Sequence, residues 1–387
     1  MKMPAPLLHI AAIASIAACC AASAAHPSVT TAAVVAEGAR QPRVATSPDG
    51  NHAYVVYGKG EDVYLRTIET STATASSTAT STTATTATAA VTTSTFSAPS
   101  LVAHVSGLML GMRRGPQIAC TISTVVVTAC GAEGNVDCWT SDLSAKTWNR
   151  PVIVNDRHGS ANEGLTGLTS GHNGFLYSVW LDTRNGGHQL FGSGSNDGGR
   201  TWTANACVYS SPEGTVCECC QPQVAVRNSD GLVCVMWRNW LHGARDMYQA
   251  ESSDGGVHFS PAVKLGQQSW MLRGCPMDGG TLSACGAETS VTAVWRWEKS
   301  LYLTRGAGNE QLLGEGRNAS SAYVAATNTC YVCWQDPNDQ ILLKPGDNAP
   351  AIVVGTGKFP SIAATPNGAA IIVWESNNNA VSARFTP

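Results

Sequence analysis

Four cysteines in two stretches are the residues best suited to bind a metal or to crosslink this chain. Cys217, Cys219 and Cys220 lie within one four-residue string, and Cys275 precedes a proline further on. In an oxidising compartment such thiols form disulfides, and adjacent cysteines then bond to different partners. As thiolates they bind Cu(I) or zinc. The string lacks the paired CxxC spacing of established zinc sites, so the sequence favours no cofactor. The alternative is copper or zinc bound at these four cysteines.

Arginines and one tryptophan in the same part of the chain could hold an acidic sugar. Guanidinium groups bind carboxylates bidentately, and an indole ring can stack on a sugar ring. The chain has only 24 Lys plus Arg, so a local group of arginines is informative. The substrate-binding candidates are Arg184, Arg238, Arg245, Trp270 and Arg273. The alternative is structural: arginines that pair with carboxylates hold long loops together.

Acidic residues among these arginines are the candidates for catalysis. Glycoside hydrolysis uses two acids, or a tyrosine with its base, separated by roughly 5 to 10 Å across a pocket. The catalytic candidates are Asp182, Glu218, Asp246 and Asp278. No spacing in the sequence determines how far apart they lie, so the sequence leaves open whether the protein is an enzyme. It contains no Gly-x-Ser-x-Gly elbow and no glycine-rich phosphate loop.

Two matching octapeptides, residues 195–202 and 252–259, show which elements position these residues. Each reads Ser-x-Asp-x-Gly-x-polar-aromatic, and their first serines lie 57 residues apart. This pattern predicts a hairpin turn in which Asp accepts amide hydrogens, Gly supplies a positive φ and the aromatic ring enters the core. The structural residues are Ser195, Asp197, Gly199 and Trp202 in the first copy and Ser252, Asp254, Gly256 and Phe259 in the second. A degraded third copy spans residues 140–148.

A second repeat consists of apolar strands that end in tryptophan. The tryptophans are Trp180, Trp237, Trp295, Trp334 and Trp374, spaced by 57, 58, 39 and 40 residues. Residues 221–265 show a whole unit of four antiparallel strands, with expected strands at 222–226, 232–237, 246–251 and 259–265. Comparable units begin near residues 41, 115, 162, 221, 278, 318 and 359. The sequence therefore predicts an all-β propeller of seven four-stranded blades, with six as the alternative, whose last blade is completed by residues 29–36.

The octapeptides resemble the Asp box of the sialidase (BNR-repeat) family. This resemblance implies a sialidase-like propeller with its site on the face opposite the Asp boxes, where the connections that carry the candidate cysteines, arginines and acids also fall. Catalytic members have a Phe/Tyr-Arg-Ile-Pro motif, an arginine triad, a Tyr-Glu couple and an Asp acid/base. The chain has no Arg-Ile-Pro, and Pro42 precedes Arg43 here. The resemblance thus implies the fold, whereas activity does not follow from fold alone.

The remaining composition bears on location and partners. Residues 1–25 resemble a secretory signal, which predicts export to the bacterial periplasm or the outside, and residues 16–19 resemble a lipobox that would instead give an outer-membrane lipoprotein. Residues 26–387 are expected to form one domain, with a Thr/Ala/Ser-rich low-complexity insertion at about 70–95. The formal net charge is −3 with no basic run, which argues against nucleic acid. No later apolar stretch is long enough to span a membrane.

Three functions follow from these observations. The favoured one is an exported sialidase-like propeller that binds an anionic glycan or glycoconjugate, and it includes the activity of an exo-alpha-sialidase-type hydrolase. The second is a propeller without catalysis that binds glycans or a protein partner. The third is an exported copper, zinc or redox protein that uses the Cys217-to-Cys220 string.

Overall fold

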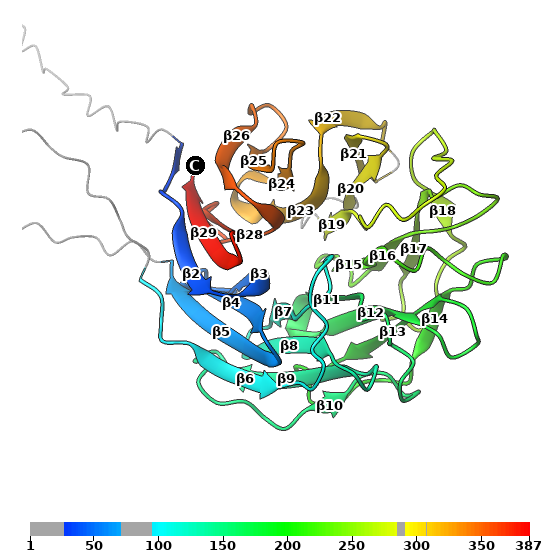
Figure 1. The fold of residues 1–387 in the computed structure, drawn as a ribbon, viewed down its shortest axis with the longest axis horizontal. Coiled ribbons are helices and arrows are strands. Elements are labelled where there is room, and N and C mark those ends of the chain that lie inside the picture. The colour runs from blue at the N-terminus through cyan, green and yellow to red at the C-terminus, as the bar shows by residue number, and fades with distance from the viewer. Residues whose placement is uncertain (1–26, 71–94, 285–290, 307) are drawn as a thin grey trace, which may run out of the picture.

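The computed structural model describes residues 27–70, 95–284, 291–306 and 308–387. The chain forms a ring of seven antiparallel sheets around a central axis (Figure 1). The innermost strands contact one another in a closed cycle. The predicted all-β propeller with seven blades is therefore confirmed. The expected leader at 1–25, and residues 71–94 of the predicted insertion, lie outside the described residues.

Blades 1 to 3 contain β3 to β14, and blades 4 to 6 contain β15 to β26. In each of these blades the first strand in the chain lies nearest the axis and the fourth lies outermost. Blades 1 to 3 consist of β3 (Arg40–Thr46), β4 (His52–Lys59), β5 (Asp62–Glu69), β6 (Ser100–His104); β7 (Gln117–Cys120), β8 (Thr124–Cys130), β9 (Val136–Asp142), β10 (Val152–Ile153); and β11 (Thr166–Ser170), β12 (Leu176–Asp182), β13 (Gln189–Ser195), β14 (Ala206–Tyr209). Blades 4 to 6 consist of β15 (Gln223–Val226), β16 (Val233–Arg238), β17 (Met247–Ser252), β18 (Val263–Lys264); β19 (Thr281–Ala284), β20 (Val291–Trp297), β21 (Ser300–Arg305), β22 (Gln311–Glu315); and β23 (Arg317–Val324), β24 (Thr329–Gln335), β25 (Gln340–Pro345), β26 (Ile352–Thr356).

Blade 7 joins the two ends of the described chain. It contains β27 (Lys358–Ala364), β28 (Ala370–Ser376) and β29 (Asn379–Thr386), and its outer edge is formed by β1 (Ser28–Val29) and β2 (Ala33–Glu37). Both N-terminal strands pair antiparallel with β29, and β2 is interrupted by a bulge. Figure 1 shows β2 beside β29. The chain thus closes its own ring and covers the edge that β29 would otherwise expose.

The core lies between neighbouring blades. The second strands are runs of valine, isoleucine and other apolar residues that are buried on both faces, as a middle strand between two packed sheets requires. The tryptophans at their ends are at most 4% exposed. The period of these tryptophans therefore reflects one large side chain in each of blades 3 to 7, whereas the second strands of blades 1 and 2 contain none. Of the predicted strands in residues 221–265, the outermost is shorter than expected, because β18 pairs with β17 over two residues only.

The two Asp boxes close the hairpins between the third and fourth strands of blades 3 and 4. Asp197 Oδ1 accepts the main-chain N–H groups of Arg200 and Thr201 at 3.0 and 2.9 Å, and Ser195 Oγ accepts that of Gly199 at 2.9 Å. The second box repeats these bonds around Asp254. In both boxes, hydrogen bonds from the Ser and Asp side chains therefore close the turn. The two boxes lie on the same face as the turns between first and second strands, because successive hairpins of a blade alternate between faces.

The described part of the chain contains no α-helix, and accordingly no helix there has the length and apolarity to cross a membrane.

Candidate functional site

The central channel opens on the Asp-box face into a cavity lined by both polar and apolar side chains. The channel itself is a space of about 380 Å³ lined by the first strands of all seven blades. Its mouth is a cavity of about 340 Å³ bounded by the turns that follow β3, β7, β11, β15, β23 and β27. The two spaces share Thr46, Cys120, Ser170, Asn228, Tyr323 and Ala364. A ligand at the mouth could therefore extend into the channel.

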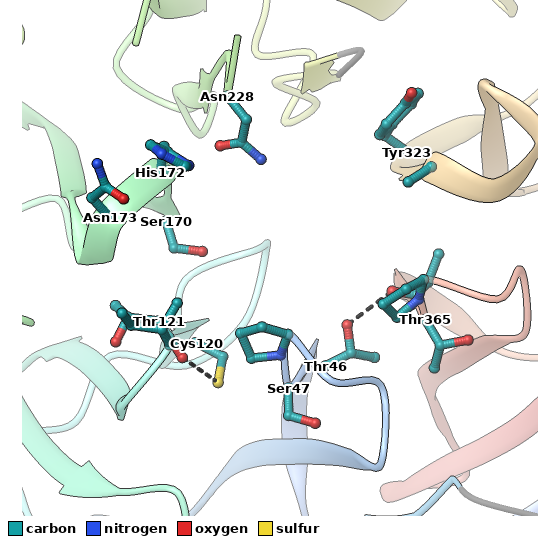
Figure 2. A pocket seen from close by; sticks show the side chains of 16 residues that line it. Thr46, Ser47, Cys120, Thr121, Ser170, His172, Asn173, Asn228, Tyr323 and Thr365 are labelled. Carbon is teal, nitrogen blue, oxygen red and sulfur yellow. Dashed lines mark hydrogen bonds between the residues drawn. The ribbon is translucent and has the colours of Figure 1, made fainter. Parts of the chain in front are cut away.

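The side chains around the mouth carry hydroxyl, amide, imidazole and phenol groups (Figure 2). His172, Asn173 and Asn228 are exposed, and within the described residues their side chains make no hydrogen bond. Tyr323 lies across the opening from His172 and donates its hydroxyl to Asn328 at 2.9 Å. Among its described lining residues the mouth has no Asp, Glu, Lys or Arg. The site thus offers many neutral donors and acceptors and no carboxylate.

The sequence candidates lie on the opposite face, in connections between second and third strands and between blades. Asp182 ends β12 and is fully buried. Its carboxylate accepts hydrogen bonds from Ser160 Oγ at 2.6 Å, Trp180 Nε1 at 2.8 Å, and the N, Nε and Nη2 of Arg184 at 2.8 to 2.9 Å. Burial alone would raise its pKa, but these hydrogen bonds outweigh burial and lower the pKa of Asp182. Asp182 therefore acts as the centre of a buried hydrogen-bond network in blade 3.

The other three acids are in different surroundings. Asp246 accepts the Trp270 N–H at 2.7 Å. Asp278 accepts the Asn318 N–H at 3.1 Å and lies 3.6 Å from Arg296 Nε, so both aspartates are buried in loop contacts. Glu218 is half-buried between the cysteines. The geometry joins Asp246 and Asp278 through Arg238, whose guanidinium donates to main-chain carbonyls beside each of them, while Asp182 belongs to a separate network.

Most of the predicted substrate-binding residues are also engaged in contacts within the chain, and Arg273 is the exception. Arg184 binds Asp182 and Asp156 and lies over the Phe191 ring. Arg238 is buried and bonds the carbonyls of residues 245, 278 and 296. The Trp270 ring is 8% exposed and lies within about 5 Å of the guanidiniums of Arg238 and Arg296. Arg273 in the same loop is exposed, and no hydrogen bond to it occurs among the described residues.

Three residues that sequence reasoning did not select meet at the axis on this face. Arg43 on β3 and Arg113 in the connection before β7 both donate to the side-chain oxygen of Gln221 at 3.0 Å. Arg113 is 3% exposed and also bonds the carbonyls of Ala319 and Gly280. Burial, reinforced by the charge of Arg113, lowers the pKa of Arg43 to about 9. The sequence shows Arg43 directly after Pro42 on an expected first strand. Nothing in that local sequence indicates that Arg43 would meet Gln221 far along the chain.

The cysteine string forms a compact cluster. The Sγ atom of Cys217 lies 3.6 Å from those of Cys219 and Cys220, which are 4.0 Å from each other. Arg245 Nη1 donates to Cys217 Sγ at 3.0 Å. Hydrogen bonds from the two neighbouring thiols, together with the Arg245 charge, lower the pKa of Cys217. Cys275, the fourth predicted member, is exposed and is not within this group.

Apart from the exposed Cys207 and Cys275, the other described cysteines behave as buried apolar residues. Burial raises the pKa of Cys120, Cys138 and Cys333 to about 12, which makes these thiols poor nucleophiles and poor ligands. None of the eleven cysteines in the described ranges forms a disulfide in this structure. The cluster at 217–220 is therefore chemically distinct from the cysteines of the blade cores.

Comparison with known proteins supports the fold. No family model matches the chain, and no curated protein sequence is significantly similar to it. Among solved structures, an ulvan lyase of polysaccharide lyase family PL25 matches with a TM-score of 0.50 at 11% identity, covering 90% of this chain and 93% of the lyase. The Hadza microbial sialidase Hz136 matches with a TM-score of 0.46 at 13% identity, and the match covers 69% of this chain and 64% of the sialidase. The fucose-specific lectin of Aleuria aurantia matches with a TM-score of 0.47 at 10% identity, and the match covers 69% of this chain and 88% of the lectin.

The similarity to the ulvan lyase agrees with the β-propeller fold, and membership of the BNR family is not shown. Structures at such low identity share the arrangement of strands, whereas ligands and activities belong to sites built on that arrangement. The chain spans less than two thirds of the length of Hz136. The function of this protein must therefore be argued from its own residues.

Proposed function

We propose that this protein is an exported glycan-binding propeller whose ligand site is the channel mouth on the Asp-box face. The observation that carries the proposal is the composition of the cavity of about 340 Å³, which combines serine, threonine, asparagine, histidine and tyrosine and lacks charged acids and bases among its described lining residues. Sugar hydroxyls both donate and accept hydrogen bonds, and these side chains can do the same. The volume falls at the lower end of the range for small-molecule sites, roughly 300 to 1,000 Å³, which suits a short saccharide.

The surroundings of the mouth also provide apolar surface for a sugar ring. Ile122 in the turn after β7 is 68% exposed, and the half-buried Tyr323 faces the same opening. Rings and exposed aliphatic groups pack against the C–H faces of sugars, while amides and hydroxyls orient the polar edge. The neutral lining favours a neutral saccharide over the acidic sugar expected from the sequence.

Binding is proposed in preference to hydrolysis. Cleavage of a glycosidic bond requires acid and base groups at the site, and the described lining of the mouth contains neither Asp nor Glu. On the opposite face, Asp182, Asp246 and Asp278 are held in hydrogen bonds within the chain. The ulvan lyase shows that a propeller of this kind can hold a saccharide, since its structure is that of a complex with -[GlcA(1-4)Rha3S]-. The proposal for this chain depends on its own cavity.

The test is a screen of neutral and sialylated glycans with the purified mature protein, followed by calorimetry of the best ligand. Asn228→Ala should weaken binding about 3- to 10-fold, the value of one hydrogen bond of about 0.5–1.5 kcal/mol. Tyr323→Ala should weaken it further because it removes ring contact. Asn348→Ala, an exposed asparagine in the turn after β25, is the matched control and should leave binding unchanged.

Two positive results and one negative result would contradict the proposal. One is a glycan whose affinity is the same in the Asn228 and Tyr323 variants as in the unchanged protein, because the site would then lie elsewhere. The other is release of sialic acid from a fluorogenic sialoside with loss of release on changing Asp278 or Glu218, which would place a hydrolase on the opposite face. Absence of binding to any glycan would favour a protein partner and would equally overturn it.

A further inference from the structure

The string from Cys217 to Cys220 is held rigidly at both ends. Val216 N donates to His188 O at 2.9 Å, and Cys217 N donates to Arg238 O at 3.1 Å. At the other end, the Gln221 side chain donates to Thr166 O at 2.6 Å and accepts from two buried arginines. These contacts tie the string to blades 3 and 4 and to the axis. The positions of the thiols are therefore set by the fold before any ligand arrives, which reduces the ordering cost of binding.

The spacing of the three sulfur atoms fits metal coordination. With a metal–sulfur bond of about 2.3 Å, sulfur atoms stand about 3.8 Å apart around a tetrahedral ion and about 4.0 Å apart around a trigonal one. The three distances here are 3.6, 3.6 and 4.0 Å. A disulfide would place two sulfurs at about 2.05 Å and would leave the third thiol without a partner. The triangle thus matches three ligands on one ion.

Charge and burial favour the same conclusion. Cys217 and Cys220 are buried, and a buried thiolate is costly unless a positive charge compensates it. Arg245 supplies one such charge at 3.0 Å from Cys217 Sγ. The Arg245 side chain is kept in place by the loop around Trp240, over whose ring its guanidinium lies. A bound Cu(I) ion would compensate a further unit of the negative charge of the thiolates.

The ligand set selects the metal. Among the described residues the group consists of three thiols, with no histidine or carboxylate joining it. Structural zinc sites almost always have four protein ligands, so three thiolates leave zinc one ligand short, whereas the same soft ligands also suit Cu(I). Cys275 is exposed on the next connection and lies outside the group, so a fourth sulfur is not in place.

We propose that Cys217, Cys219 and Cys220 form a three-coordinate Cu(I) site on the face opposite the channel mouth. Each bound Cu(I) forms three Cu–S bonds and displaces the protons that remain on the thiols into solution, with no change in oxidation state of copper or sulfur. Arg245 is a positioning residue that acts through Cys217. Because this site and the channel mouth lie on different faces and share no residue, loss of one should leave the other intact.

The experiment is an anaerobic titration of the reduced full-length mature protein with Cu(I), buffered by a chromogenic Cu(I) chelator. We expect one Cu(I) per chain, proton release on binding, and a copper K-edge X-ray absorption spectrum with three sulfur neighbours. Cys219→Ser, at the least buried ligand, should lower affinity more than 100-fold, and Arg245→Gln should lower it about 10- to 100-fold, as loss of a supporting residue does. Cys207→Ser, an exposed cysteine on β14, is the matched control and should change nothing.

Cys217→Ser is a second test at a buried ligand, with folding monitored by circular dichroism. Several outcomes would overturn the proposal: binding unaffected by Cys219→Ser, tight binding of zinc with exclusion of Cu(I), or a disulfide among residues 217–220 in protein isolated from an oxidising compartment without reductant. A copper site that also requires Cys275 would show four sulfur neighbours and would refute the three-coordinate geometry.

Discussion

The network around Asp182 provides a direct test of whether this carboxylate supports the fold or performs chemistry. The Asp182 carboxylate accepts five hydrogen bonds from Ser160, Trp180 and Arg184 and is fully buried. In Asp182→Asn the guanidinium of Arg184 would lose its buried counter-charge, a change that typically costs about 3–5 kcal/mol. We therefore expect the free energy of unfolding to fall by about that amount, measured by urea denaturation followed by tryptophan fluorescence.

Asp156→Asn is the matched control for this prediction. Asp156 binds the same guanidinium at 2.9 Å, but its side chain is 50% exposed, so its loss should cost at most about 1 kcal/mol. The acid dependence can be checked as well. Because the pKa of Asp182 is lowered in the folded state, its contribution is fully present above the unfolded pKa of about 3.9 and is lost as pH falls through the folded value. The difference between the unchanged protein and Asp182→Asn should therefore shrink below about pH 4.

If the free energy of unfolding of Asp182→Asn lay within about 1 kcal/mol of that of the unchanged protein, this reasoning would be refuted. If the same variant kept its stability but lost an activity toward glycans, Asp182 would be a catalytic residue, as its type and position in the sequence suggested. A loss of stability equal to that of Asp156→Asn would mean that the buried hydrogen bonds contribute no more than an exposed ion pair.

The remaining predictions concern the elements that form the ring. In the second Asp box, a Cβ on Gly256 would lie 2.0 Å from Tyr177 Cε2 at a φ of +86°. Gly256→Ala should lower the free energy of unfolding by about 2–4 kcal/mol, measured by denaturation. Gly255→Ala is the control: its φ is +77°, but a Cβ there meets open space, so the loss should be only about 1 kcal/mol. Equal losses in the two variants would contradict the packing argument. Deletion of residues 28–37 removes the closing strands and the buried Val35. It should lower the melting temperature by several degrees and promote self-association through the open edge of β29, seen by size-exclusion chromatography; an unchanged melting curve would show that closure is not required.

Much of the fold was predictable because the information is local. An Asp box specifies its own turn through bonds between residues at most five positions apart, such as Asp197 with Thr201, so its sequence is sufficient to identify it. One tryptophan recurs in each of blades 3 to 7 because these interfaces are filled by a large apolar side chain, and its period locates these blades, whereas the second strands of blades 1 and 2 contain no tryptophan. Closure by the N-terminal strands followed from the missing fourth strand of the last unit, since an open edge is unfavourable.

The contacts of the candidate site residues were decided by tertiary structure. Arg238 bonds carbonyls 40 and 58 residues away, and Arg43 meets Gln221 178 residues along the chain, so no spacing in the sequence reveals that their donors are used within the fold. The channel mouth collects single turns from six blades, each unremarkable alone. The cysteines were visible as a string, but whether their sulfurs converge depends on loop contacts to two blades. Local patterns determined the blades because their hydrogen bonds are short in sequence, whereas the sites depend on residues that only the closed ring brings together.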